Sequence, residues 1–157
     1  MTYGDNAQPA DGPLRATVRI AKRPIHPMLV PFPIVCFVGA LVTDIAYVST
    51  AEIMWADFSA WLLVVGMITG VLAAISGLID FFSNRLIRTN GLAWLHMIGN
   101  LVVLLLALLN TLVHTRDAWT SVVPLGLTLS AIVVLILCFT TWLGRSMVYR
   151  YGIGAIK

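Results

Sequence analysis

Charged side chains are scarce in this chain of 157 residues: only 11% are Asp, Glu, Lys or Arg, whereas 59% are hydrophobic. A soluble domain typically carries about 25% charged and about 45–50% apolar residues. A water-soluble core of this size could not hide so much apolar surface, so the composition excludes a soluble enzyme and a disordered tail and favours a lipid environment.

Cysteine is just as sparse, with only Cys36 and Cys138 in the chain. Both lie inside apolar runs and lack Cys-x-x-Cys spacing, which excludes a disulfide scaffold and a dithiol redox motif. We expect both to be small buried apolar residues. The first 24 residues are polar and contain no apolar stretch of the kind found in a signal peptide.

Long apolar runs dominate the rest, over Pro27–Tyr47, Phe58–Phe82, Leu92–Val113 and Val122–Leu143. About 20 apolar residues in a helix cross the hydrocarbon layer, and backbone groups in lipid must bond within the segment. We therefore predict an all-α fold, a four-helix transmembrane bundle with helices over about 27–48, 58–82, 92–114 and 121–143. This transmembrane domain (25–143) lies between a polar basic arm (1–24) and a tail (144–157).

The basic residues are distributed unevenly along the chain. Nine of the ten lie in the arm, the second loop or the tail, among them Arg15, Lys22 and Lys157, and only Arg116 lies in another loop. The positive-inside rule therefore predicts that both termini are cytoplasmic. The basic residues that give the net charge of +3 therefore orient the protein in the membrane and contact membrane lipids. No nucleic-acid partner is expected.

Polar residues inside the third run share one helix face. His96, Asn100, Asn110 and His114 are offset by 0, 4, 14 and 18 positions, which places them within about 40° of one line on a helix. A polar stripe facing lipid is costly, so we expect it to face the interior of the bundle.

Matching depths predict two polar clusters. His26 and Asp44 are 18 residues apart, like His96 and His114, and the first and third helices run in the same direction. The cluster near the predicted cytoplasmic end, which we call the inner station, should contain His26, Asp80 and His96, with Asn84 and Asn100 close in sequence. The cluster near the opposite end, which we call the outer station, should contain Asp44, Asn110 and His114.

Small residues mark the second run. Gly66, Gly70 and Gly77 lie close to one line on the helix, and the first two form a Gly-x-x-x-Gly pair that permits close helix contact.

Three chemistries could use the polar clusters. A b-type haem would need two imidazoles at similar depth, and His26 and His96 are the pair that fits as axial ligands, with Asp80 orienting one of them. Proton handling would use Asp44 and Asp80 as carriers and the histidines as relays. In a purely structural role, the Asp and His pairs would set the register of the helices.

Several motifs resemble the domain-of-unknown-function 2231 family of small bacterial membrane proteins. The similarity covers Ile25 to Gly154 and is carried by His26-Pro27 with Phe32-Pro33, Asp44, Gly77-Leu78-Ile79-Asp80, His96 with Asn100, Trp142-Leu143-Gly144, Val148-Tyr149-Arg150 and Gly152-Ile153-Gly154. The resemblance implies a four-span protein of the bacterial inner membrane. It supplies no established reaction, ligand or catalytic residue.

These observations favour a small membrane subunit, not an enzyme on its own, whose His/Asp core supports redox or proton-coupled work. Its partner would be a redox subunit or a second copy of the chain. One alternative is a non-catalytic scaffold or assembly protein, whose glycine-rich second helix packs against a partner. Another is a solute or proton transporter that acts as an oligomer.

Overall fold

A computed structural model describes residues 19–20, 23–116 and 118–151. Most of the predicted basic arm, including Arg15 and Lys22, lies outside the described residues, as do Gly152-Ile153-Gly154 and Lys157. Within them, two short antiparallel strands, β1 (Arg19–Ile20) and β2 (Arg23–Pro24), precede the helices. The helices are α1 (Ile25–Leu29), α2 (Pro31–Thr50), α3 (Ile53–Ser83), α4 (Arg85–Arg88), α5 (Gly91–Val113), α6 (Ala118–Val122) and α7 (Leu125–Tyr151).

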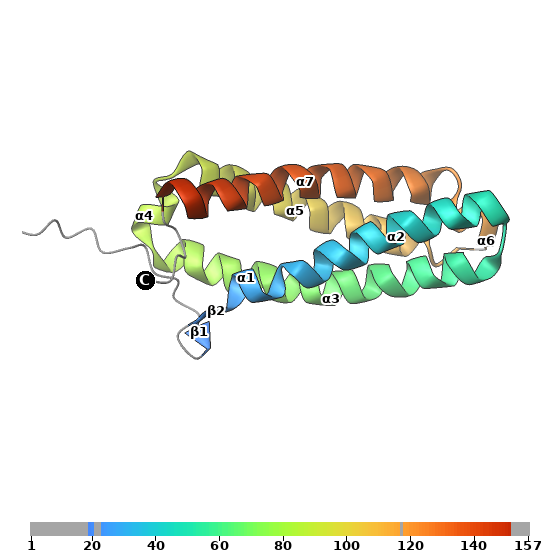
Figure 1. Ribbon diagram of the computed structural model, residues 1–157, viewed down its shortest axis with the longest axis horizontal. Helices are drawn as coiled ribbons and strands as arrows, with labels where there is room; N and C mark the ends of the chain where they lie inside the picture. The colour runs from blue at the N-terminus through green and yellow to red at the C-terminus, as the bar shows by residue number, and fades with distance from the viewer. Residues whose placement is uncertain (1–18, 21–22, 117, 152–157) are drawn as a thin grey trace, which may run out of the picture.

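The helices form an elongated four-helix bundle, as the sequence predicts (Figure 1). Four segments are long and apolar enough to cross a membrane, namely Ile25–Thr50, Ile53–Ser83, Gly91–Val113 and Thr120–Arg150. The most extensive helix contacts are those of α2 with α3 and of α5 with α7. The start of α1, the end of α7 and α4 lie at one end of the bundle, and α6 lies at the other.

Two helices extend beyond their apolar runs. Helix α3 begins at Ile53, although the run predicted a start near residue 58, and α7 continues to Tyr151, so that the first half of the predicted tail is helical. Both differences have the same cause. An apolar run marks only the part of a helix that lies inside the hydrocarbon layer. The helix itself can continue beyond the run, until a residue adopts a non-helical backbone conformation. Ala51, in the left-handed conformation at φ 58°, ends α2 and leaves Glu52 as the residue that precedes α3.

The first span is irregular where its prolines gather. Helix α1 ends at Leu29 and α2 begins at Pro31, with Val30 between them donating its N–H to the carbonyl of His26 at 3.1 Å. Pro31 and Pro33 have no N–H to continue the hydrogen-bond ladder from α1. This break places His26 on a short separate helix that packs against α3.

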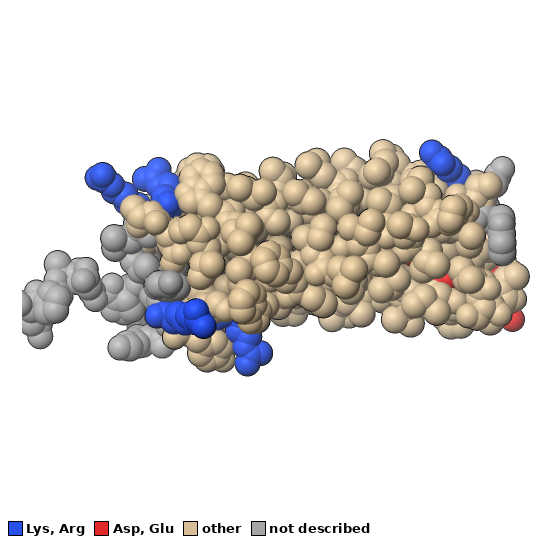
Figure 2. Space-filling model, turned by 90° about the horizontal axis from the view of Figure 1, so that it is seen from above, with Lys and Arg blue, Asp and Glu red and all other residues tan. Residues whose placement is uncertain are grey.

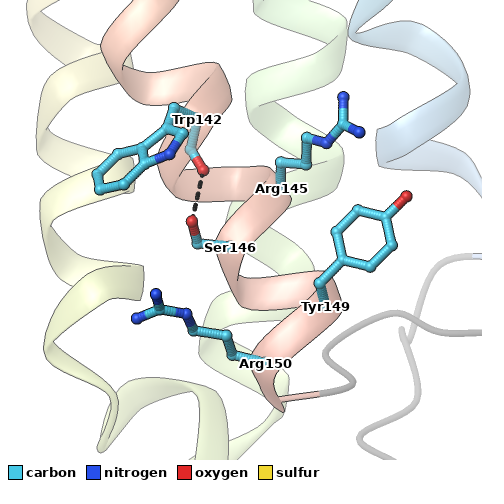
Figure 3. Close-up of a pocket in the computed structure, with 5 residues that line it drawn as sticks. All are labelled: Trp142, Arg145, Ser146, Tyr149 and Arg150. Carbon is cyan, nitrogen blue, oxygen red and sulfur yellow. Dashed lines mark hydrogen bonds between the residues drawn. The ribbon is translucent and has the colours of Figure 1, made fainter.

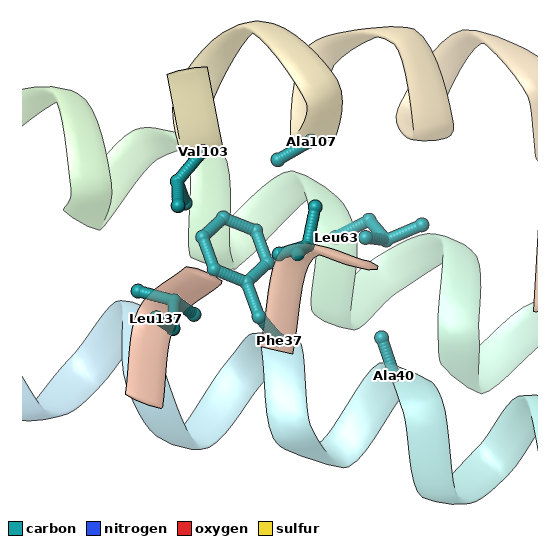
Figure 4. Close-up of a cluster of buried hydrophobic side chains, with 7 residues drawn as sticks. Phe37, Ala40, Leu63, Val103, Ala107 and Leu137 are labelled. Carbon is teal, nitrogen blue, oxygen red and sulfur yellow. The ribbon is translucent and has the colours of Figure 1, made fainter. Parts of the chain in front are cut away.

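The interior and the surface differ in an unusual way for a globular chain. A central cluster of apolar side chains includes Phe37, Leu63 and Val103 (Figure 4). Yet Asp44 and Asn110 are fully buried, whereas Leu135 is 70% exposed. On the face shown in Figure 2, charged side chains gather at the two ends and the length between them carries none. Apolar side chains facing outward and polar ones facing inward suit a chain whose solvent is lipid.

The cysteines differ in their surroundings. Cys36 is buried in the bundle, as expected, but Cys138 is exposed on α7. The expectation of burial is therefore wrong for Cys138, because an apolar run in a membrane helix covers the outward face as well as the inward one.

The small residues of α3 pack inside the chain. A Cβ added at Gly66 would lie 2.7 Å from a ring carbon of Phe37, and one added at Gly70 would lie 2.9 Å from a methyl carbon of Leu104. The Gly-x-x-x-Gly face is thus filled by α2 and α5 of the same molecule, which leaves this face unavailable to a second copy.

Replacing Gly66 by Val should lower the free energy of unfolding by about 1–3 kcal/mol, because the added methyl groups overpack the contact with Phe37. Unfolding of the purified protein in detergent micelles measures the change. Gly91→Ala is the control, since an added Cβ at Gly91 meets no atom within 4 Å. Equal stability of Gly66→Val and Gly91→Ala would contradict this account of the close contact.

Candidate functional site

The outer station joins three helices through buried side chains. His114, the C-cap of α5, contacts Asp44 of α2 with 3.0 Å between Nε2 and Oδ1. The hydroxyl of Ser130 on α7 donates to the other carboxylate oxygen of Asp44 at 2.6 Å. Asn110 in turn donates from Nδ2 to the Ser130 oxygen at 2.8 Å. Matched depth predicted Asp44, Asn110 and His114 as one cluster, and the structure brings them together through Ser130.

The hydrogen bonds of His114 fix the number of protons on this pair. Its Nδ1 lies 3.0 Å from the carbonyl oxygen of Asn110, and a carbonyl only accepts, so Nδ1 carries a proton. The short contact between Nε2 and Asp44 then needs one further proton, either on Nε2 or on Oδ1. In both arrangements the pair has no net charge, which allows both side chains to be almost completely buried.

Ser130 is the member of the outer station that sequence reasoning missed. A serine in a membrane helix can bond the carbonyl of its own preceding turn, so its presence in a run predicts no partner on another helix. The available signal was depth: Ser130 lies early in α7 and Asn110 lies late in the antiparallel α5. The side-chain oxygen Oδ1 of Asn110 remains buried without a hydrogen-bond partner among the described residues.

The inner station brings His26 and His96 together. Nδ1 of His26 lies 2.8 Å from the carbonyl oxygen of Ala73 on α3, and Nδ1 of His96 lies 2.9 Å from that of Thr140 on α7. Because both acceptors are carbonyls, each Nδ1 carries a proton, which leaves Nε2 as the atom that can offer a lone pair. The ring centroids are 6.3 Å apart and the ring planes are nearly perpendicular, at 89°.

A glycine lies against each imidazole. A Cβ added at Gly77 of α3 would lie 2.9 Å from Nδ1 of His26, and one added at Gly144 of α7 would lie 3.0 Å from Cε1 of His96. Any larger residue at either position would push on the ring. Gly77 was predicted only as a packing residue, and Gly144 was noted only in the Trp142-Leu143-Gly144 motif. Their effect is to let each ring sit close to a helix backbone.

The other residues expected in the inner station play different parts. The amide nitrogen of Asn100 donates to the carbonyl of His96 at 2.8 Å and lies 3.3 Å from Nε2 of the same histidine. Asp80 is half-buried on α3. At both His26 and His96 a backbone carbonyl accepts from Nδ1.

Comparison with known proteins identifies a family and no further relative. A family model described as a predicted membrane protein, DUF2231, matches residues 22–157. No curated protein and no solved structure shows significant similarity to this chain. The match extends over all four candidate spans and both polar stations.

Proposed function

The chain belongs to the DUF2231 family of predicted membrane proteins, and from this premise we propose that it is a membrane redox subunit that holds one b-type haem between His26 and His96. The single observation that carries the proposal is the inner station. There, two imidazoles approach each other with both Nδ1 atoms bonded to backbone carbonyls.

The hydrogen bonds at Nδ1 suit ligation of a metal through Nε2, for which the Asn100 amide would have to turn away from Nε2 of His96, now 3.3 Å from it. A histidine that ligates a metal through Nε2 donates its other ring N–H to a carbonyl or carboxylate, which fixes the tautomer and the ring orientation. Both His26 and His96 meet this requirement, with Ala73 and Thr140 as the acceptors. The proposal therefore needs no change of tautomer at either ring.

The spacing of the rings suits one metal atom. A metal–nitrogen bond to histidine is about 2 Å, so a metal held by two Nε2 atoms separates the ring centres by roughly 6 Å. The observed separation of the centroids is 6.3 Å. Perpendicular ring planes do not hinder axial ligation, because each ring bonds the metal along its own Nε2 direction.

The two histidines also come from different parts of the bundle. His26 lies on α1, which packs on α3, and His96 lies on α5, which packs most extensively on α7. Two axial ligands carried by different helices suit a planar group held between them. A haem also takes only these two ligands from the protein, since the porphyrin supplies the rest, and when bound it would accept and donate single electrons.

A scaffold that binds no cofactor is the second candidate, and the outer station favours it. Asp44, His114, Ser130 and Asn110 link α2, α5 and α7 through buried hydrogen bonds, which is what a device that sets helix register would do. The two candidates differ in the expected behaviour of the inner station.

An absorption spectrum distinguishes them. The full chain is expressed in bacteria supplied with a haem precursor, purified in mild detergent and reduced with dithionite. We expect a Soret band and a sharp α band of a low-spin b-type haem, at a ratio approaching one haem per chain. Well-folded protein that takes up no haem, either in cells or on addition of haemin to the purified chain, would overturn the redox proposal and leave the scaffold.

A further inference from the structure

A shallow, open cavity lies on the outer surface of α7, near its C-terminal end. Its volume is about 180 Å³, and its lining residues are Trp142, Arg145, Ser146, Tyr149 and Arg150 (Figure 3). These positions recur every three to four residues, so they form one face of the helix. Arg145 and Arg150 extend to either side of Ser146 in this view. We propose that this cavity binds the phosphate headgroup of an anionic phospholipid.

The donors in the cavity suit a phosphate. The hydroxyl of Ser146 donates to the carbonyl oxygen of Trp142 at 2.9 Å, so its proton is already engaged. Among the described residues, the donors left for a phosphate are therefore the guanidinium groups, which bond phosphate oxygens with charge-assisted hydrogen bonds. The guanidinium carbon of Arg145 lies 5.5 Å from the ring centre of Tyr149, a contact that positions this cation beside the cavity.

The surface next to the cavity suits acyl chains and so favours a phospholipid over free phosphate as the ligand. Leu135, Phe139 and Trp142 are all exposed and follow one another along the face of α7 that leads to Arg145. The rings of Phe139 and Trp142 lie 6.2 Å apart between their centroids. Trp and Tyr are the residues that favour the headgroup level of a bilayer, so Trp142 and Tyr149 would place the cavity at that level.

The opposing explanation is that Arg145 and Arg150 serve only as topology signals, as the sequence alone suggests. Arg85 and Arg88 of α4 lie at the same end of the bundle and carry the same charge. A general electrostatic attraction to anionic lipid would depend on all four arginines equally. A site would depend on the two that line the cavity.

Native mass spectrometry of the purified full chain, titrated in detergent with phosphatidylglycerol or phosphatidylcholine, measures the binding. Arg145→Gln with Arg150→Gln should weaken phosphatidylglycerol binding by at least about tenfold, because two charge-assisted hydrogen bonds are lost. The control is Arg85→Gln with Arg88→Gln, which removes equal charge and should change binding less than about twofold. Both variants are also melted without lipid, and unchanged unfolding shows that the fold is intact.

Three outcomes would overturn the proposal. The first is an equal loss of binding in the two double variants. The second is equal binding of phosphatidylglycerol and phosphatidylcholine to the unaltered chain. The third is displacement of phosphatidylglycerol by inorganic phosphate at the same concentration, which would assign the cavity to free phosphate. Should an unfolding defect accompany Arg145→Gln, Arg145→Lys with Arg150→Lys replaces the pair, and binding restored to within about threefold of the unaltered chain supports the site.

Discussion

Replacing Asp44 by Ala is expected to lower the free energy of unfolding by about 3–5 kcal/mol, because it removes one partner of a buried hydrogen-bonded pair and leaves His114 without the other. The side chains of Asp44 and His114 are 0% and 1% exposed, so water does not replace the lost carboxylate. Ser130 also loses the acceptor of its hydroxyl proton. Unfolding of the purified chain in mixed micelles, followed by loss of helical circular dichroism, measures the difference.

The matched control is the double variant Asp44→Asn with His114→Gln, which removes both titratable groups and keeps groups that can hydrogen-bond. It should recover more than half of the loss, since replacing both partners of a buried pair costs far less than removing one. A loss of only about 0.6 kcal/mol in Asp44→Ala, the average for one hydrogen bond between membrane helices, would contradict this account of the buried pair.

The depth of each polar residue could be predicted from the sequence. Apolar runs mark where each helix enters and leaves the lipid, and consecutive helices alternate in direction, so Asp44 and His114 had to lie near one end. The same argument placed His26 and His96 near the other. In both cases the structure brings the paired residues close together. The depth of a residue in the membrane depends only on its position along its own helix, so a single sequence is enough to predict it.

The partners of these residues could not be predicted, for two physical reasons. The choice among neighbouring helices depends on helix order around the bundle, which spacing along one helix does not determine. This is why the hydrogen bond from Ser130 to Asp44 could not be predicted. The second reason is that every residue carries a carbonyl group, so nothing distinguishes Ala73 or Thr140 as an acceptor for histidine.

Glycines carried part of the missing information. Gly77 and Gly144 are the positions where a backbone lies close enough to an imidazole that a methyl group would collide with it. Both glycines lie in the sequence motifs, but a glycine in a membrane helix indicates only that another part of the protein packs closely against it. Which group approaches became clear from the three-dimensional arrangement. The same holds for Gly66, which accommodates Phe37 of its own chain and not a second copy.

Replacing His96 by Gln should abolish the b-type absorption spectrum, and His26→Gln should do the same. Changing a residue that only supports a metal ligand typically weakens metal binding roughly 10–100-fold, and losing the ligand itself should cost at least as much. Gln keeps a side chain of similar reach that can still accept or donate hydrogen bonds at the Thr140 or Ala73 carbonyl. Haem content per chain, measured with the pyridine haemochrome method and compared at equal protein concentration, reports the loss.

The third histidine provides the matched control for this result. His114 lies in the outer station, bonded to Asp44 and distant in depth from His26 and His96. Changing it together with its partner, as His114→Gln with Asp44→Asn, removes one imidazole without leaving a buried charge, and the spectrum should persist. If that control lost its haem as completely as His96→Gln while remaining folded, the ligands would not be the inner pair. If instead His26→Gln and His96→Gln both kept a full b-type spectrum, the two rings would not be the haem ligands and their close approach would serve packing alone. The inner station would then only join helices, as the outer station does.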